Sequence, residues 1–378
     1  MIQQVIRVEQ LAAQLAQGQP VTVLDVRPNA ERAEWFIPGS LHLDVYEDLK
    51  AGRVKALADL VLPHDRPVVT VCGAGKTSLI AADYLREKGL DAYSLEGGMA
   101  AWSLAWNQAR VPLPGGSPLG AAQVIQVRRT GKGCLSYLIG VAGSPLAGAA
   151  AVVDPSLAPA VYMDLAQAHG WTLTHVLETH VHADHLSRGR VLAEQSGATL
   201  YLPAGAPVTY PHVALRDGDE LALGSSRIRA LHTPGHTQES TSYLLDHQAL
   251  FTGDTLFIGA VGRPDLEATP DQARQRAHLL YASLARLLTL PAQTRVLPGH
   301  TSEPVAFDGV ALTGTLAEAR VQIALLRLPE AEFVDALLAR VPPTPPNHHR
   351  IVEFNQAGVL PAGDLTELEA GANRCAVI

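Results

Sequence analysis

Residues 179–185 read THVHADH and place His180, His182, Asp184 and His185 within six positions. The run before the cluster, THVLETH, predicts a strand, and the run after it, HLSRGRVLAEQSG, predicts a helix. The cluster therefore belongs to the loop at the carboxyl end of a strand, where side chains from neighbouring strands converge. This spacing of imidazole and carboxylate groups indicates a metal site rather than packing.

Three later turns repeat the same pattern, in which a strand ends, a small-residue turn follows and a metal-ligand residue is displayed. TPGHT presents His236, FTGDT presents Asp254 and VLPGH presents His300. With the first cluster they make seven imidazole or carboxylate groups, enough for one or two divalent metals.

This ordered set resembles the metallo-β-lactamase superfamily, over residues 121 to 345. The resemblance implies a four-layer αββα sandwich with the metal site at one edge. Two branches of the superfamily use all seven residue types. In the glyoxalase II branch two metals share Asp254, and a bridging hydroxide attacks a thioester. The other ligands of that branch would be His180, His182 and His236 for one metal, and Asp184, His185 and His300 for the other.

In the persulfide dioxygenase branch, one Fe(II) is held by two histidines and a carboxylate, here His180, His236 and Asp254. The remaining four residues of the set then surround the iron or hold a second metal. The segment LFIGAVGRPDL after Asp254 also resembles this branch, in which Arg263 would anchor the carboxylates of a thiol substrate.

A second candidate site is the stretch VVTVCGAGKTSLIAA, residues 68–82. A phosphate loop needs a glycine where this chain has Thr70, so nucleotide binding is not expected. Cys72 instead directly follows a strand, and the small residues after it can turn backbone N–H groups toward its sulfur. The helix starting near Thr77 adds its positive end, which would lower the thiol pKa and make Cys72 a nucleophile.

The motifs LDVR, IPGSLHL and LEGGMAAW around this loop resemble a rhodanese over residues 1 to 108. The resemblance implies that Cys72 carries a sulfane sulfur as a persulfide. Rhodanese loops commonly carry an arginine where this chain has Thr77, with Lys76 as the nearby cation, so recognition of thiosulfate is expected to be altered. The loop residues expected to bind the sulfur substrate are Gly73, Gly75, Lys76 and Thr77.

The whole chain has 378 residues, a net charge of −8 and an ordinary composition, with 47% hydrophobic and 17% charged residues. An acidic chain with no evident basic face argues against a nucleic-acid partner. No apolar run approaches a membrane span, and the first residues do not resemble a signal peptide. Three scattered cysteines, Cys72, Cys134 and Cys375, are too few for a disulfide framework, so a cytoplasmic location is expected.

The expected organisation is α/β throughout: a rhodanese-like domain at 1–108, a Pro/Gly-rich linker at 109–120, a metallo-β-lactamase domain at 121–345 and a docked tail at 346–378. Cys134 is expected to pack in the core of the second domain, and Cys375 to belong to the docked tail. The resemblance and the apolar end of the tail also make a homodimer an expectation.

Joining the two resemblances favours a persulfide dioxygenase fused to a rhodanese. One Fe(II) per chain would use O₂ to oxidise a low-molecular-weight thiol persulfide to sulfite and thiol, and Cys72 would exchange sulfur with sulfite or thiosulfate. The alternative is a glyoxalase II-like hydrolase with two zinc ions and an attached rhodanese. A sulfide sensor without activity is disfavoured, because both sets of residues are complete. The thiol carrier stays open among glutathione, coenzyme A and bacillithiol.

Overall fold

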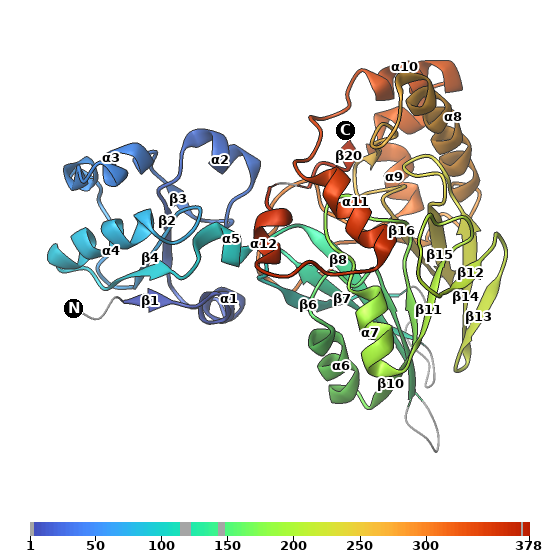
Figure 1. Cartoon of the computed structure of the whole chain (residues 1–378), viewed down its shortest axis with the longest axis horizontal. Coiled ribbons are helices and arrows are strands. Elements are labelled where there is room, and N and C mark those ends of the chain that lie inside the picture. The colour runs from blue at the N-terminus through green and yellow to red at the C-terminus, as the bar shows by residue number, and fades with distance from the viewer. Residues whose placement is uncertain (1–3, 114–121, 143–147, 372) are drawn as a thin grey trace.

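The computed structural model describes residues 4–113, 122–142, 148–371 and 373–378. These residues form two α/β lobes that lie side by side, the smaller one blue and the larger one green to red in Figure 1. The α/β class expected from the sequence is confirmed.

The N-terminal lobe is built on a five-stranded parallel sheet with the strand order β1-β5-β4-β2-β3. Its central strands are apolar because helices cover both faces of the sheet. The strands are β1 (Val5–Ile6), β2 (Thr22–Asp25), β3 (Leu41–His42), β4 (Val68–Val71) and β5 (Ala92–Leu95). The helices are α1 (Val8–Ala16), α2 (Asn29–Glu34), α3 (Tyr46–Lys50), η1 (Val54–Leu57), α4 (Thr77–Glu87) and α5 (Gly98–Trp102).

The larger lobe contains two mixed sheets. The first has the order β12-β11-β10-β9-β8-β7-β6 and the second the order β13-β14-β15-β16-β18-β19. The strands of the first sheet are β6 (Asn107–Arg110), β7 (Gln123–Arg129), β8 (Cys134–Val141), β9 (Gly148–Val153), β10 (Trp171–Leu177), β11 (Thr199–Pro203) and β12 (Val213–Leu215). Those of the second are β13 (Glu220–Leu223), β14 (Ser226–His232), β15 (Thr241–Leu245), β16 (Ala249–Gly253), β18 (Arg295–Pro298) and β19 (Gly314–Thr315).

Three apolar layers show how the larger lobe is stacked. Between the sheets, Tyr137 of β8 packs with Tyr243 of β15 and Phe251 of β16. The outer face of the first sheet packs on α6 (Pro159–Ala168) and α7 (Gly189–Ser196), and that of the second on further helices. These helices are α8 (Pro270–Leu287), α9 (Leu316–Gln322), η2 (Ala324–Arg327) and α10 (Glu330–Leu338). The result is the expected αββα sandwich.

The junction between the lobes differs from the expected linker. Ala109 and Arg110 lie in β6, which pairs antiparallel with β7 and so belongs to the second lobe. The boundary is set by backbone pairing of β6 with a later strand, which cannot be predicted from the composition of residues 109–120. Residues 114–120 of the expected linker lie outside the described residues.

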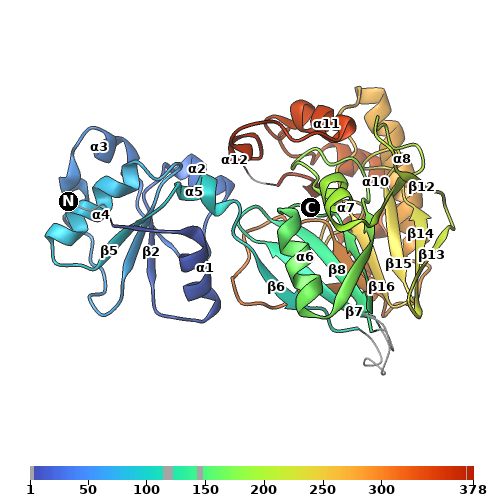
Figure 2. The same cartoon turned by 60° about the horizontal axis from the view of Figure 1, so that its bottom comes forward.

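The C-terminal segment packs against both lobes. It contains α11 (His348–Ala357), α12 (Leu365–Leu368) and β20 (Ala376–Val377), and β20 pairs with β17 (Val261–Gly262). Helix α12 lies beside α5 of the first lobe, as Figures 1 and 2 show. Trp35 of the first lobe also donates its Nε1–H to the carbonyl of Thr130 at 3.2 Å.

A buried ion-pair group fixes the end of α12 to the larger lobe. The carboxylate of Glu369 pairs with Nη2 of Arg129 at 2.7 Å and with Nη2 of Arg188 at 3.2 Å. It also accepts the backbone N–H of Leu186 at 2.8 Å. The loop after the histidine cluster is therefore held by the C-terminal segment.

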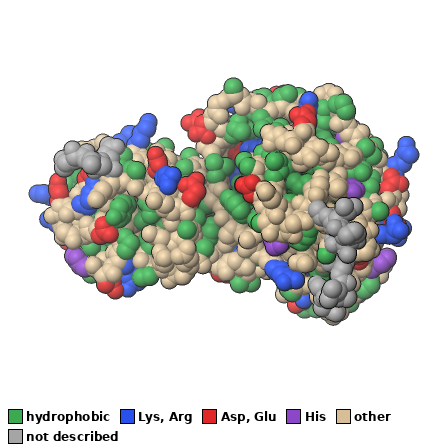
Figure 3. Space-filling model, turned by 90° about the horizontal axis from the view of Figure 1, so that it is seen from below, with side chains coloured by type: hydrophobic (Ala, Val, Ile, Leu, Met, Phe, Trp, Pro, Cys, Tyr) green, Lys and Arg blue, Asp and Glu red, His purple; other side chains and the backbone are tan. Residues whose placement is uncertain are grey.

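Within the described residues no helix is long and apolar enough to cross a membrane. On the face of the molecule in Figure 3, acidic and basic side chains are interspersed over both lobes.

Candidate metal centre

The expected metal ligands follow strands that end at one edge of the sandwich. The first cluster lies after β10, His236 after β14, and His300 after β18, while Asp254 comes directly after the last residue of β16. The turn before His236 needs a glycine, because Gly235 has φ +145° and an added Cβ would lie 2.5 Å from Cα of Leu280. The strand ends and tight turns thus bring the side chains together.

The first group of donors is His180, His236 and Asp254, all of them buried. Oδ2 of Asp254 lies 3.9 Å from Nε2 of His180 and 3.7 Å from Nε2 of His236. The other ring nitrogens are occupied: Nδ1 of His180 contacts Oγ1 of Thr179 at 2.9 Å, and Nδ1 of His236 contacts the carbonyl of Arg263 at 2.8 Å. These outer contacts orient both Nε2 atoms toward Asp254.

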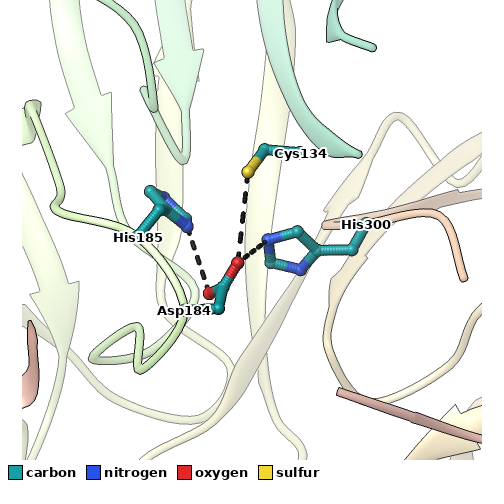
Figure 4. Close-up of side chains that lie close together, drawn as sticks. All are labelled: Cys134, Asp184, His185 and His300. Atoms are coloured by element: carbon teal, nitrogen blue, oxygen red, sulfur yellow. Dashed lines mark hydrogen bonds and ion pairs between the residues drawn. The ribbon is translucent and has the colours of Figure 1, made fainter. Parts of the chain in front are cut away.

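The second group contains Asp184, His185, His300 and Cys134 (Figure 4). One carboxylate oxygen of Asp184 lies 2.8 Å from Nε2 of His300, and the other lies 3.1 Å from Nδ1 of His185. Sγ of Cys134 lies 4.0 Å from Oδ2 of Asp184. One donor atom of each residue lies within 4.8 Å of the others.

Asp254 joins the two groups. Its Oδ2 faces His180 and His236, while its Oδ1 lies 2.7 Å from Nδ1 of His300. A His300 that donates from Nδ1 to Asp254 presents the lone pair of Nε2 to the second group.

His182 lies apart from the first group, where the glyoxalase II resemblance placed it. Its Nε2 lies 3.2 Å from Oε2 of Glu178 and 3.3 Å from Oδ1 of Asp154, which makes a third buried group. Asp154 is fixed in turn by the N–H and hydroxyl of Thr179, at 2.7 and 2.8 Å. Sequence reasoning missed Asp154 and Glu178, although Asp154 stands at the end of a strand like the other acidic donor.

The charge balance of these groups calls for cations. Four buried carboxylates, those of Asp154, Glu178, Asp184 and Asp254, form ion pairs only with histidines in the part of the chain that the structure describes. Buried carboxylates need a compensating positive charge, and here they outweigh burial and raise the pKa values of His182 and His300 well above the usual range, so that protons or metal ions supply the charge. The Nε2 atoms of His180 and His185 and Oδ2 of Asp254 are buried without a hydrogen-bond partner, which fits metal ions at the first two groups.

The protonation states of four of these side chains suit metal binding. Burial, reinforced by the charge of His182, holds the pKa of His180 well below its usual range, and burial also lowers the pKa of His236. Burial alone would raise the pKa values of Asp184 and Asp254, but the positive charge of His300 outweighs it and lowers both. Neutral imidazoles and ionised carboxylates are the forms that bind metals, so His180, His236 and the two carboxylates are already in that form. Asp184 and Asp254 outweigh burial and raise the pKa of His300 well above its usual value, so a metal ion at the second group would displace a proton from it.

The two cysteines of this lobe both reach the site. Burial would raise the pKa of Cys134, but His185 and His300 outweigh it and lower that pKa to about 6. Burial and the carboxylates of Asp254 and Asp184 hold the pKa of Cys375 well above its usual value. The expected core position of Cys134 is thus corrected: its sulfur is buried among metal-ligand side chains, because the start of β8 pairs with the turn at His300.

Arg263 is completely buried and makes four hydrogen bonds. Two of them go to the carboxylate of Asp265, and one each to the carbonyls of Pro343 and Arg374. This guanidinium braces the C-terminal segment. Its expected role in anchoring a substrate carboxylate stays a prediction.

A cavity of about 370 Å³ reaches the second group at His300. Its walls are mostly apolar and include Leu135, Phe257, Leu312 and Ile378. Among the described residues, Glu303 is the charged side chain of the lining, and no lysine or arginine faces this cavity. The cavity therefore suits an uncharged part of a substrate.

In the smaller lobe, Cys72 directly follows β4, and its thiol accepts a hydrogen bond from Oγ of Ser78 at 3.2 Å. The loop is anchored on α5, because the N–H groups of Met99 and Ala100 donate to the carbonyls of Cys72 and Gly73. Gly98 permits this approach: it has φ +58°, and an added Cβ would lie 2.2 Å from the carbonyl oxygen of Cys72.

The four predicted sulfur-binding residues differ in exposure. Gly75 and Thr77 are buried, Gly73 is partly buried, and Lys76 is exposed. Gly73 lines a cavity of about 280 Å³ that also touches Trp35 of this lobe and Gly371 of the C-terminal segment. Asp25 and Arg27 of the LDVR motif are joined by two hydrogen bonds between their side chains, at 2.7 and 2.9 Å, and so tie this lobe together near the loop.

Comparison with known families assigns both lobes. Residues 7–105 match the family described as rhodanese-like domain, and residues 129–300 match the metallo-beta-lactamase superfamily. The crystal structure of ETHE1 from Myxococcus xanthus is similar, with 32% identity, a TM-score of 0.53, and 62% of this chain and 97% of that chain covered. The chain belongs to the metallo-beta-lactamase superfamily, with a rhodanese-like domain before the superfamily domain.

A metallo-beta-lactamase from Staphylococcus aureus subsp. aureus COL is also similar in structure, with 28% identity and a TM-score of 0.57 over 63% of this chain and 73% of that one. Among curated relatives, the hydroxyacylglutathione hydrolase of Methylococcus capsulatus is 41% identical over 167 residues, 43% of this chain and 60% of the relative. That of Pseudomonas paraeruginosa is 40% identical over 152 residues, 40% of this chain and 56% of the relative. This chain thus spans about 60% of the length of such relatives.

These comparisons correct the expected activity. The ETHE1 neighbour fits the expected fusion of a rhodanese with a persulfide dioxygenase-like domain, but hydroxyacylglutathione hydrolases dominate among the curated relatives. The expected dioxygenase activity, and with it the oxidoreductase class, is wrong by this finding. The presence of a rhodanese-like domain on the same chain does not decide between the two branches, because it involves no residue of the metal site.

Proposed function

We propose that the larger lobe is a metal-dependent thioester hydrolase of the hydroxyacylglutathione hydrolase type, joined to a sulfur-transferring rhodanese domain. The observation that carries this proposal is the position of Asp254, whose carboxylate faces His180 and His236 with one oxygen and His300 with the other. A carboxylate between two buried donor groups suits two neighbouring divalent ions, zinc in our proposal, rather than a single Fe(II). The names of the curated relatives support the same reading.

Two bound divalent ions would supply a nucleophilic hydroxide at neutral pH and would polarise the thioester carbonyl. The protein holds neutral imidazoles at His180 and His236 and an ionised carboxylate at Asp254, so the first group is ready to bind an ion without a proton change. The carboxylates outweigh burial and raise the pKa values of His185 and His300, so an ion at the second group would displace protons from these imidazoles. The cavity beside His300 would hold the acyl part of the substrate against apolar walls and exclude water from it.

The cavity also bears on the thiol part of the substrate. Glutathione carries two carboxylates, yet within the described chain the lining offers Glu303 and no basic side chain. We therefore place the thiol carrier outside this cavity, with the acyl group inside it. The carrier itself stays open.

In the smaller lobe, the thiolate of Cys72 would attack the outer sulfur of thiosulfate. A sulfur–sulfur bond forms on Cys72, and sulfite leaves with the electron pair of the bond that breaks. A thiol acceptor then takes the outer sulfur and restores the cysteine. Three free cysteines, all buried, fit the cytoplasmic location that we propose for both activities.

The test uses the full-length protein loaded with zinc. Hydrolysis of hydroxyacyl thioesters of glutathione and of coenzyme A is followed by the absorbance of the thioester bond. Asp254→Asn should reduce hydrolysis by about three orders of magnitude, the scale expected for loss of a central electrostatic group. Asp271→Asn, at an exposed position of α8, is the matched control and should retain activity. Intact thioesters after incubation with the metal-loaded wild type would refute the proposal.

A further inference from the structure

Cys134 is held beside the metal-ligand turn by the backbone. Cys134 and His300 form an isolated antiparallel bridge, the N–H of Leu135 donates to the carbonyl of Gly299 at 2.7 Å, and the N–H of Thr301 donates to that of Gly133 at 2.9 Å. The sulfur therefore has a fixed position relative to His300.

Cys134 differs from the other two cysteines in its lack of apolar cluster neighbours among the described residues, although Cys375 also lies near the carboxylates of Asp254 and Asp184. Cys72 and Cys375 each belong to a cluster of buried apolar side chains, whereas none of the clusters found in the described chain includes Cys134. Its side chain is 1% exposed and meets the carboxylate of Asp184 at 4.0 Å. A buried cysteine used only for packing would be expected among apolar neighbours.

The second group also contains a ring nitrogen that makes no hydrogen bond within the part of the protein that the structure describes. Nε2 of His185 is buried without a hydrogen-bond partner, and Nε2 of His300 faces the carboxylate of Asp184. Figure 4 shows Cys134, His185 and His300 arranged around Asp184. Two imidazoles, one carboxylate and one sulfur, each with a donor atom within 4.8 Å of the rest, match the four donors of a tetrahedral zinc site.

We propose that Cys134 is the fourth protein ligand of the second metal ion, together with Asp184, His185 and His300. This inference rests on the two-metal site of the proposed function, and it adds a sulfur donor to that site. A site with four protein donors is closed, whereas the group of His180, His236 and Asp254 supplies three donors and leaves a position for water or substrate. The two ions would therefore have different tasks: the second would be held tightly, and the first would carry the open position.

The sulfur donor also selects the metal. Thiolate with imidazole favours zinc and other borderline or soft ions, while magnesium and manganese prefer oxygen ligands. The second site should therefore take zinc or cobalt(II) and reject magnesium.

The experiment titrates cobalt(II) into full-length protein that has been freed of metal. Bonding of a thiolate to cobalt produces a strong charge-transfer band in the near ultraviolet, and this band should grow with one cobalt per chain. Cys134→Ser should abolish the band and weaken zinc binding at the tighter site by more than the roughly 10- to 100-fold that follows loss of an outer partner. Cys375→Ser is the matched control, because Cys375 lies near the same carboxylates, and it should keep the band.

A double variant, Cys72→Ser with Cys375→Ser, leaves Cys134 as the last cysteine and removes any dependence on the folding of Cys134→Ser. The band in this variant supports the proposal. A wild type that binds cobalt without the band, or a band that disappears with Cys375→Ser, overturns it. Failure of the proposed hydrolysis is a separate outcome, since the band reports the ligand whether or not thioesters are cleaved.

Discussion

Replacement of Glu369 by glutamine is expected to destabilise the protein by about 3 kcal/mol at pH 7. Burial would raise the pKa of this carboxyl, but Arg129 and Arg188 outweigh burial and lower the pKa from 4.5 to about 2. At about 1.4 kcal/mol for each pKa unit, this depression corresponds to about 3 kcal/mol of stability. Glutamine keeps the shape but leaves both guanidinium groups buried without a counter-charge, and the cost of breaking a buried pair is of the same order.

The sign of the pH dependence follows from the lowered pKa. The stabilisation is complete above pH 4.5, where the unfolded carboxyl is also ionised, and it is lost as the pH falls toward 2. The difference between wild type and Glu369→Gln should therefore shrink from about 3 kcal/mol at pH 7 to about 2 kcal/mol at pH 3.5.

Urea unfolding of both proteins at the two pH values measures this difference. Glu367→Gln, an exposed neutralisation on the same helix, is the control and should change the free energy of unfolding by less than about 0.5 kcal/mol. A Glu369→Gln effect below about 1 kcal/mol at pH 7, or one that does not change with pH, would refute the reasoning.

Cys72→Ser should abolish sulfur transfer from thiosulfate and leave the rate of thioester hydrolysis within about twofold, because the thiol lies in the other lobe. Parallel assays of both reactions measure the two rates, and loss of both activities would contradict the prediction. Phe333→Ala should cost about 3 to 5 kcal/mol in urea unfolding, because this completely buried ring packs between α10 and α8. Removal of metal with a chelator should lower the melting temperature, because Asp184 and Asp254 would lose their cations, and added zinc should restore it. Calorimetry with and without the chelator measures the shift, and an unchanged melting temperature would speak against bound metal.

The succession of a strand, a turn and a metal-ligand residue could be predicted from the sequence, because each of these features depends on neighbouring residues alone. The periodicity of β14, β16 and β18 and the small residues after them predict that His236, Asp254 and His300 meet at one sheet edge, and the structure brings them together. The αββα architecture followed from the resemblance that this order supports, and it is confirmed.

Other features depend on which distant residues pair, and no local pattern reports them. Cys134 stands in an apolar run and was expected in the core, but its bridge to His300 turns the sulfur into the metal site. His182 has the same local setting as His180, yet Asp154 draws its ring into another group. Arg110 was assigned to a linker, although its backbone pairs with Ile125. Each outcome is set by long-range register rather than by composition.

The C-terminal segment holds the histidine loop through α11 as well as through Glu369, and this has a consequence for protein synthesis. Asn355 donates its side-chain N–H groups to the carbonyls of His182 and His185, and it follows His185 by 170 residues. At about 5 to 20 residues per second, a ribosome needs roughly 10 to 30 s to cover that distance. During this interval the nascent chain carries its histidine cluster without the helix that holds the loop, so we expect the loop to reach its final geometry only after α11 has left the ribosome.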